Sequence, residues 1–359
     1  MKKEVSSLEL RFLVQELQLL VGCRIDKIYQ PAPKTFVLAL RKAGEDKRFL
    51  RIELPKFLYL TSRKEEMPGK LTGFCGYLRK YLEGLAITGV EQLSSERVVK
   101  FSLASKEESF SVFLEFFAKG NMIICDGEGT IVNCLEPVVF KERIVKPGVA
   151  YELPERANAF TLTFDQFKQL QGENISTAIA TGLGMGGLVA HELCALAGVA
   201  PAAKITPDAV EKLFVAWQTL LKRKAVPLLV LKDEIPDEVL PFAMKQFEKT
   251  TTTPLHSLSE GLDKLFVAPV AAKKETRADK VKTIIAMQEQ SANKFEAVAA
   301  EEQKRGEFMY EHYQDVKQIL DELVLQMKHH SLQELQVTFK GHKHVKEIDP
   351  KTGNVTVEF

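Results

Sequence analysis

The sequence contains little that would build a disulfide-linked, metal-binding or membrane-spanning protein. It has five cysteines in 359 residues, an odd number without a C-x-x-C pair. This argues against a disulfide framework or a zinc ribbon and fits a reducing cytoplasm. No apolar run approaches the roughly 20 residues of a transmembrane helix. The first apolar residues are interrupted by Glu9, Arg11 and Gln15, which predicts an amphipathic helix rather than a signal peptide. We therefore expect a cytoplasmic protein with no membrane partner.

Catalytic and cofactor-binding motifs are also missing. None of the seven histidines belongs to an H-E-x-x-H helix, and no nucleophile elbow is present. The glycine-rich stretch TGLGMGGL at residues 181–188 lacks the Gly-Lys-Ser/Thr ending of a P-loop. We predict no catalytic residue, no metal ligand and no cofactor.

Length and composition predict a globular chain of two or three units. Hydrophobic residues make up 45% and charged residues 27%, which is ordinary. The formal net charge of +1 hides an asymmetry, because residues 1–100 carry a balance of +7 and the remainder −6. A basic N-terminal part suggests a polyanionic partner, although ordinary surface charge explains the same numbers.

Hydrophobic periodicity predicts an antiparallel β-rich α+β domain over residues 1–156. Ser6 or Ser7 can cap a first helix that ends at Gly22, and a second helix is expected over residues 74–83. Alternating runs separated by turn residues predict the strands. They are 24–29, 35–40, 49–54, 57–60, 86–92, 97–103, 110–117, 121–125 and 130–135, with 151–154 as a closing edge.

The rest of the chain is predicted to be mainly helical. Residues 157–225 form a helical domain, with helices over 164–170, 175–181, 188–197 and 209–221. Residues 226–274 are expected to be a linker and the start of a middle region, with a β-like patch at 227–231 and a linker through 250–254. A heptad pattern predicts a long coiled-coil arm over 275–330, divided at its polar middle around Glu302–Arg305. Residues 331–359 are expected to be a β-hairpin that pairs Gln336–Phe339 with Val355–Phe359 through Pro350–Asn354.

The segment LGMGGLVAHEL, residues 183–193, fits a helix-hairpin-helix. Gly184 and Gly186 permit a tight turn, and Gly187 belongs to the same candidate phosphate-binding segment before the next helix. Outward-pointing N–H groups and the helix dipole can then hold a nucleic-acid phosphate without reading its base. A glycine turn used only for close helix packing fits the same residues.

Two further pairs of charged residues are candidates for nucleic-acid contact. Arg79 and Lys80 lie on the polar face of the second predicted helix, where they either contact phosphates or are simply solvated. Glu96 and Arg97 open a strand, and an arginine held by a neighbouring carboxylate is a preorganised fork for a phosphate or a base edge. On these residues alone, a solvated turn pair that contributes little to stability is the better interpretation.

Several blocks of the sequence resemble the NFACT family of ribosome-associated quality-control proteins, the RqcH, NEMF and FbpA-like proteins. They cover nearly the whole chain, and the Lys-Gly-Asn turn is closest to archaeal-like members. The N-terminal architecture also resembles formamidopyrimidine-DNA glycosylases. Those enzymes use an N-terminal proline where this chain has Lys2, so glycosylase activity is not expected. The blocks are FCGYLRKYLEG at 74–84, GCRIDKIY at 22–29, KGN at 119–121, and the segments 183–197, 258–263 and 304–307.

The resemblance implies a protein that binds large ribosomal subunits carrying a stalled peptidyl-tRNA. Such proteins hold an incoming aminoacyl-tRNA for template-free C-terminal alanine tailing, while the ribosome makes the bond. The resemblance therefore implies a protein that positions tRNA and is not itself an enzyme. Glu9, Glu96 and Arg97 match the family's tRNA-handling positions, with glutamate where the family has aspartate, and Arg11 belongs to the same opening motif as Glu9. Because the arm would lack its returning helix, self-association is expected. The alternatives are a fibronectin-binding, adhesion-type interaction protein or another nucleic-acid-binding module.

Overall fold

The computed structural model describes residues 2–62, 72–139, 143–154, 156–266, 288, 296, 299–327, 334–335, 339, 344–349 and 354–358. The chain forms two compact units, Met1–Ala271 and Ala272–Phe359. Each unit is considered by itself. Among the described residues, no helix combines the length and apolar character needed to cross a membrane.

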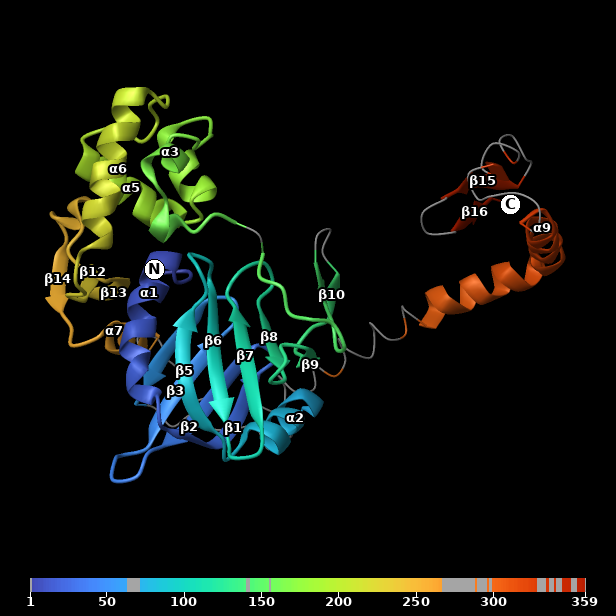
Figure 1. The fold of residues 1–359 in the computed structure, drawn as a ribbon, viewed down its shortest axis with the longest axis horizontal. Helices are drawn as coiled ribbons and strands as arrows, with labels where there is room; N and C mark the ends of the chain where they lie inside the picture. The colour runs from blue at the N-terminus through green and yellow to red at the C-terminus, as the bar shows by residue number, and fades with distance from the viewer. Residues whose placement is uncertain are drawn as a thin grey trace. The chain divides into compact units, whose positions relative to one another are not determined.

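A nine-stranded antiparallel sheet forms the body of the first unit (Figure 1). Its order, β4-β3-β2-β1-β5-β6-β7-β8-β9, joins two meanders through a short antiparallel contact in which Arg24 of β1 lies opposite Ala86 of β5. The predicted antiparallel, β-rich N-terminal domain is confirmed. The strands are β1 Arg24–Ala32, β2 Thr35–Arg41, β3 Arg48–Glu53, β4 Phe57–Thr61, β5 Ala86–Gln92, β6 Val98–Ala104, β7 Ser109–Glu115, β8 Asn121–Cys125 and β9 Ile131–Cys134.

Two helices accompany this sheet, α1 (Ser7–Glu16) and α2 (Gly73–Leu82). Ser6 caps α1 in a capping box, in which the Glu9 amide donates to Ser6 Oγ and the Ser6 amide donates to Glu9 Oε2. The predicted first helix is confirmed, although its last turn is the 3₁₀ segment η1 (Leu17–Leu20). Both helices place apolar faces in the core of the unit.

The predicted closing edge at Tyr151–Pro154 is wrong. The Tyr151 ring stacks on Phe113 with centroids 3.9 Å apart, and its amide donates to the Gly129 carbonyl at 3.0 Å, so this segment is fixed without forming a strand. Two short strands were not predicted, because a strand of two residues is too short to show an alternation of apolar and polar side chains. They are β10 Val138–Val139 and β11 Ile144–Val145.

The helical segment, residues 159–221, lies over the end of the sheet at which α1 begins (Figure 1). The helices form where they were expected, but α4 gives way to a π-helical turn, η3. Trp217 is fully buried beneath them and donates to the Ala159 carbonyl at 3.0 Å. One apolar core runs from Val5 to Leu265, so the segment shares its core with the sheet. The elements are η2 Ala159–Thr161, α3 Phe164–Phe167, α4 Ile175–Thr177, η3 Ala178–Gly182, α5 Gly186–Ala197 and α6 Pro207–Leu221.

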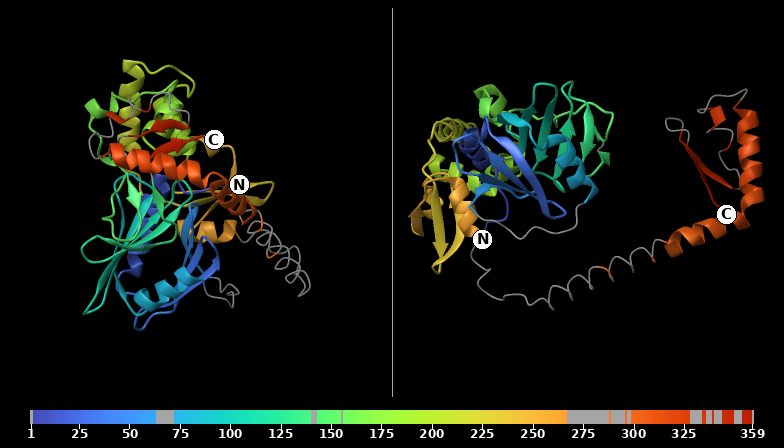
Figure 2. Two further views of the ribbon diagram at one scale, coloured as in Figure 1. Left: turned by 90° about the vertical axis from the view of Figure 1, so that its right-hand side faces the viewer. Right: turned by 90° about the horizontal axis from the view of Figure 1, so that it is seen from below.

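The predicted linker through Thr250–Pro254 is wrong, because these residues form an edge strand, β14 (Figure 2). All four β14 side chains are exposed and show no alternation, so only the ladder to β12 reveals the strand. The following helix, α7, is fastened to the sheet domain where Thr61 Oγ1 donates to Asp263 Oδ1 at 2.7 Å. The elements are β12 Leu228–Lys232, β13 Ile235–Leu240, η4 Lys245–Phe247, β14 Thr251–Pro254 and α7 Leu258–Leu265.

In the second unit, residues 299–311 are helical and α9 spans Tyr313–Gln326. The interruption falls at His312 rather than in the predicted polar middle. Arg305 pairs with Glu301 and Glu302 at 2.7 and 2.8 Å and so supports the helix there. Most of the predicted arm before residue 299 lies outside the described residues.

The expected partner strand of the C-terminal hairpin is wrong. β16 (Val355–Val357) pairs with β15 (Val345–Ile348), a strand that was not predicted. Phe339 donates its amide to the Leu335 carbonyl at 2.9 Å, and both side chains are buried in a small core with α9. Gln336 and most of the expected turn, Pro350–Asn354, lie outside the described residues.

Candidate functional site

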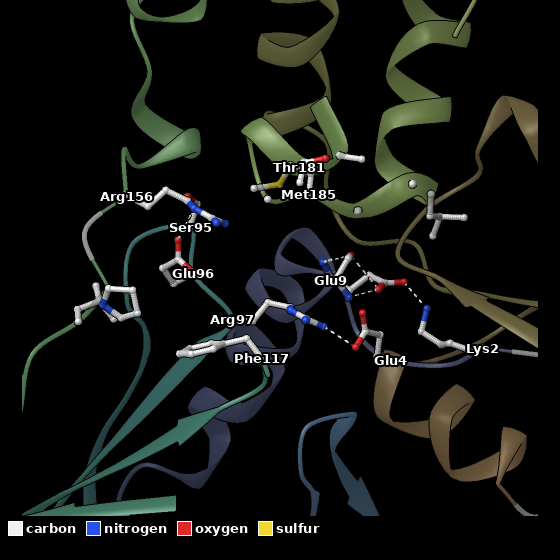
Figure 3. Close-up of a pocket in the computed structure, with 18 of the residues that line it drawn as sticks. Lys2, Glu4, Glu9, Ser95, Glu96, Arg97, Phe117, Arg156, Thr181 and Met185 are labelled. Carbon is white, nitrogen blue, oxygen red and sulfur yellow. Dashed lines mark hydrogen bonds and ion pairs between the residues drawn. The ribbon is translucent and has the colours of Figure 1, made fainter. Parts of the chain in front are cut away.

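A cavity of about 1330 Å³ opens between the end of the large sheet and the helical segment (Figure 3). Four parts of the chain form most of its walls: the N-terminal segment with the start of α1, the β5–β6 turn, the loop before η2, and the turn that leads into α5. Phe117, Arg143 and Glu238 complete the lining. The lining residues are Lys2, Glu4, Ser6, Glu9, Ser95, Glu96, Arg97, Phe117, Arg143, Glu152, Leu153, Pro154, Arg156, Ala180, Thr181, Gly184, Met185, Gly186, Gly187, Leu188 and Glu238.

The β5–β6 turn that carries Glu96 and Arg97 is held on two sides. Ser95 Oγ accepts from the Ala159 amide at 2.8 Å, which ties the turn to η2. Gln92 Nε2 donates to the Glu96 carbonyl and to the Ser7 carbonyl, both at 3.0 Å, which ties it to α1. The turn is therefore fixed to the helical segment as well as to the sheet.

Glu96 and Arg97 do not pair with each other, so the predicted fork held by its neighbouring carboxylate is wrong. Arg97 Nη1 lies 2.9 Å from Glu4 Oε2, and Glu96 Oε1 lies 3.6 Å from Arg156 Nε. In the turn that precedes β6, the Glu96 side chain points towards Arg156 and the Arg97 side chain towards Glu4 (Figure 3). Glu96 is only 8% exposed and lines the cavity, so the solvated turn pair is also wrong.

Glu9 lines the same cavity, but both oxygens of its carboxylate already contact neighbouring residues. Its Oε2 accepts from the Ser6 amide and hydroxyl at 2.7 and 2.8 Å, and its Oε1 pairs with Lys2 Nζ at 2.6 Å. Lys2 also pairs with Glu238 at 2.5 Å. Burial acts to lower the pKa of Lys2, but the two carboxylates outweigh it and the pKa is raised. Burial raises the pKa of Glu238, although Lys2 opposes the shift.

The glycine turn before α5 faces the cavity from the other side. Gly184 and Gly186 have φ of +67° and +77°, a region that glycine enters without strain. No side chain caps the N-terminus of α5, and Gly184, Gly186 and Gly187 all line the cavity. The β5–β6 turn and the glycine turn, which are nearly 90 residues apart in the sequence, therefore line the same cavity.

Three predicted contact residues lie outside the cavity lining. The Arg11 guanidinium lies over the Phe160 ring, 4.9 Å from its centroid. Arg79 Nε donates to the Ile28 carbonyl at 2.7 Å, so this side chain fastens α2 to β1. Lys80 is exposed, and its ammonium lies 4.9 Å from the centroid of the Tyr81 ring. The cavity thus brings Glu9, Glu96, Arg97 and the three glycines together and leaves these three residues out.

The prediction missed six charged residues of the cavity: Lys2, Glu4, Arg143, Glu152, Arg156 and Glu238. Arg143 pairs with Glu115 at 2.6 Å and donates to the Glu152 carbonyl at 2.7 Å. Arg156 lies between Glu96 and the glycine turn (Figure 3). No periodicity or motif marks these positions, because only the tertiary fold brings them together.

Four basic and five acidic side chains line the cavity, so it is not a generally basic surface. Any anion must be bound by particular cations and backbone donors. Within the ranges that the structure describes, no group of three or more His, Cys, Asp or Glu side chains could hold a metal ion.

The fold and the cavity define a class of α+β proteins in which an antiparallel sheet domain and a helical segment enclose a shared cavity. Two solved structures show this fold, each with a TM-score of 0.59 and 22% identity. One is the N-terminal part of the fibronectin/fibrinogen-binding protein of Streptococcus suis, covering 74% of this chain and 99% of that one. The other is the fibrinogen-binding protein of Staphylococcus aureus, covering 73% and 99%.

The family described as NFACT N-terminal and middle domains matches residues 6–352, and the chain belongs to this family. The archaeal Rqc2 homolog aRqcH of Methanocaldococcus jannaschii is 27% identical over 348 residues, which are 89% of this chain and 52% of that protein. Ribosome quality control complex subunit 2 of Saccharomyces cerevisiae is 33% identical over 156 residues, 43% of this chain and 14% of that protein. The chain therefore spans about half the length of the archaeal relative and less of the yeast protein.

Proposed function

We propose that this chain is the tRNA-holding part of a ribosome quality control factor. It binds large ribosomal subunits that carry a stalled peptidyl-tRNA and positions the incoming tRNA for template-free alanine tailing, while the ribosome forms the peptide bond. One observation carries the proposal: Arg97 and the Gly184–Gly187 turn, two independent candidates for RNA contact, face the same cavity. The names of the archaeal and yeast relatives support the quality-control role.

The cavity has the size and donors that a stretch of tRNA requires. Its volume of about 1330 Å³ exceeds the ~300–1,000 Å³ of pockets for drug-sized molecules, so it has room for part of a polynucleotide. The uncapped α5 N-terminus supplies N–H donors and a positive dipole end for a phosphate, in the manner of a helix-hairpin-helix. Such contacts position a nucleic acid without reading its sequence.

The test is tRNA binding by the purified chain at several salt concentrations. Wild-type protein should bind tRNA with an affinity that falls as salt rises, because phosphate contacts release counterions. Arg97→Glu places a second carboxylate beside Glu4 and should weaken binding at least about tenfold. Arg41→Glu is the matched control, since Arg41 is 66% exposed and outside the cavity. Equal affinities of wild type and Arg97→Glu, with both folded, would refute the site.

Sedimentation with large ribosomal subunits tests the function itself. The chain should cosediment with subunits that carry peptidyl-tRNA and much less with empty ones. Absence of both tRNA binding and cosedimentation would refute the proposal. The two proteins with similar solved structures are named for binding fibronectin or fibrinogen, so binding to immobilised fibronectin is measured in parallel with binding to tRNA. Saturable binding to fibronectin with no binding to tRNA would favour the interaction-protein alternative.

A further inference from the structure

The four cations of the cavity differ in how far other groups already neutralise them. Lys2 and Arg143 are buried, and each lies within 2.6 Å of a carboxylate. Arg97 is 22% exposed and pairs with Glu4 at 2.9 Å. Arg156 is 49% exposed, and its Nε lies 3.6 Å from Glu96 Oε1. Among these four side chains, Arg156 therefore has the charge that is most available to a ligand.

The guanidinium of Arg156 lies against the glycine turn. A Cβ atom built on Gly184 would lie 2.6 Å from Arg156 Nη1, so the guanidinium lies directly against this residue of the turn. Gly184 itself has a φ of +67°. The contact places Nη1 beside the turn that leads into the uncapped N-terminus of α5.

Glu96 faces the other side of this arginine. The residue is 8% exposed, and its Oε1 is fully buried and accepts no hydrogen bond, although it lies on the cavity lining. A buried carboxylate is unfavourable unless it is paired, and the Arg156 Nε at 3.6 Å provides the opposite charge. Since Nε faces the carboxylate, the terminal nitrogens are left to project towards the turn.

We propose that Arg156 contacts a phosphate of the bound tRNA and that Glu96 positions this arginine. The proposal rests on the proposed function, because the RNA is the ligand. One phosphate would lie between the Arg156 guanidinium and the first N–H groups of α5, where a planar fork and a helix N-terminus bind the same anion. Glu96 is then a positioning residue that need not touch the RNA.

If Glu96 positions Arg156, then Glu96→Gln should change the affinity for tRNA in the direction opposite to that expected from charge alone. If Glu96 only added negative charge to the cavity, Glu96→Gln would strengthen the binding of a polyanion. If Glu96 holds Arg156 in place, the same substitution weakens binding and has no further effect once Arg156 is absent. Glu96→Asp, which keeps the charge, should retain more affinity than Glu96→Gln.

The experiment measures the tRNA dissociation constant against salt concentration for wild type, Arg156→Ala, Arg156→Lys, Glu96→Gln, Glu96→Asp and the double variant Arg156→Ala/Glu96→Gln. Arg156→Ala should weaken binding about tenfold and reduce the slope of log affinity against log salt by about 0.7–0.9, the value for one phosphate contact. Arg156→Lys should be intermediate, because it keeps the charge without the fork. Arg41→Ala is the matched control and should behave as wild type. Melting temperatures establish that every variant is folded.

The outcomes separate the two proposals. If wild-type protein shows no salt-dependent tRNA binding, the proposed function itself fails. If wild type binds and folded Arg156→Ala matches it in affinity and slope, the phosphate role of Arg156 is wrong. If Glu96→Gln binds tRNA more tightly, or weakens binding equally with and without Arg156, the positioning role of Glu96 is wrong.

Discussion

Replacing Lys2 by methionine tests whether the buried charge cluster at the N-terminus stabilises the fold. Lys2 contacts Glu9 Oε1 at 2.6 Å and Glu238 at 2.5 Å, and its side chain is only 4% exposed. Lys2→Met removes the cation and leaves the buried carboxylate of Glu9 and the half-buried carboxylate of Glu238 without it. Removing one partner of a buried pair typically destabilises a protein by about 3–5 kcal/mol.

The loss of stability in Lys2→Met depends on pH, because a carboxylate that has lost its cation can bind a proton and become neutral. Protonating one group with an ordinary pKa of 4.5 requires about 3.4 kcal/mol at pH 7 and about 0.7 kcal/mol at pH 5. In the variant, the folded-state pKa of Glu238 lies above its unfolded value, so the penalty shrinks as pH falls towards the unfolded pKa. The melting temperature should fall by roughly 7–14 °C at pH 7 and by roughly 1–3 °C at pH 5.

The assay is thermal unfolding followed by circular dichroism at both pH values, with any tag at the C-terminus. Lys3→Met is the matched control, because Lys3 is exposed and adjacent in sequence, and its melting temperature should not change. The double variant Lys2→Met/Glu238→Gln should recover part of the loss at pH 7. A Lys2→Met protein as stable as wild type at pH 7, or a deficit that is equal at both pH values, would refute the reasoning.

Two further substitutions test the packing between distant segments. Gly120→Ala should destabilise the fold by at least about 2 kcal/mol in urea unfolding, because its φ is +71° and a Cβ would lie 2.9 Å from Pro55 backbone atoms. Gly129→Ala, with φ of +86° and open space around it, isolates the backbone strain, so an equal loss in both variants would exclude the clash. Glu16→Ala removes the carboxylate that accepts from the amides of Leu258 and Ser259, and should increase hydrogen exchange in α7 by about tenfold. Unchanged exchange in α7 would refute this anchoring role, and Gln15→Ala, at an exposed position of the same helix, is its control.

The strands of the large sheet could be predicted because each satisfies a local rule. They alternate between apolar and polar residues or end at hairpin turns, as in the meander from β5 to β9. Ser6 could be predicted as a helix cap because Glu9 stands three residues later. Each of these signals lies within a few neighbouring residues.

The elements that were missed depend on contacts between distant residues. β14 has four exposed side chains and exists because its backbone pairs with β12. β15 pairs with β16, and its Val345 shares the small core of the second unit with Phe339 and α9. In the cavity, Lys2 and Glu238 are 236 residues apart, so no local pattern connects them.

Glu9 shows why a match to a family motif does not by itself establish contact with a ligand. Both of its oxygens are occupied, Oε2 by Ser6 and Oε1 by Lys2. A glutamate suits this task, because at the third position of a helix it is long enough to reach back to the N-cap amide. Lys2 in turn fastens the start of the chain to Glu238, so Glu9 builds the cavity wall on which Arg97 and Glu4 meet. An effect of Glu9 on tRNA binding is therefore expected to act through the shape of the cavity, whereas effects of Arg97 and Arg156 are expected to act through their charge.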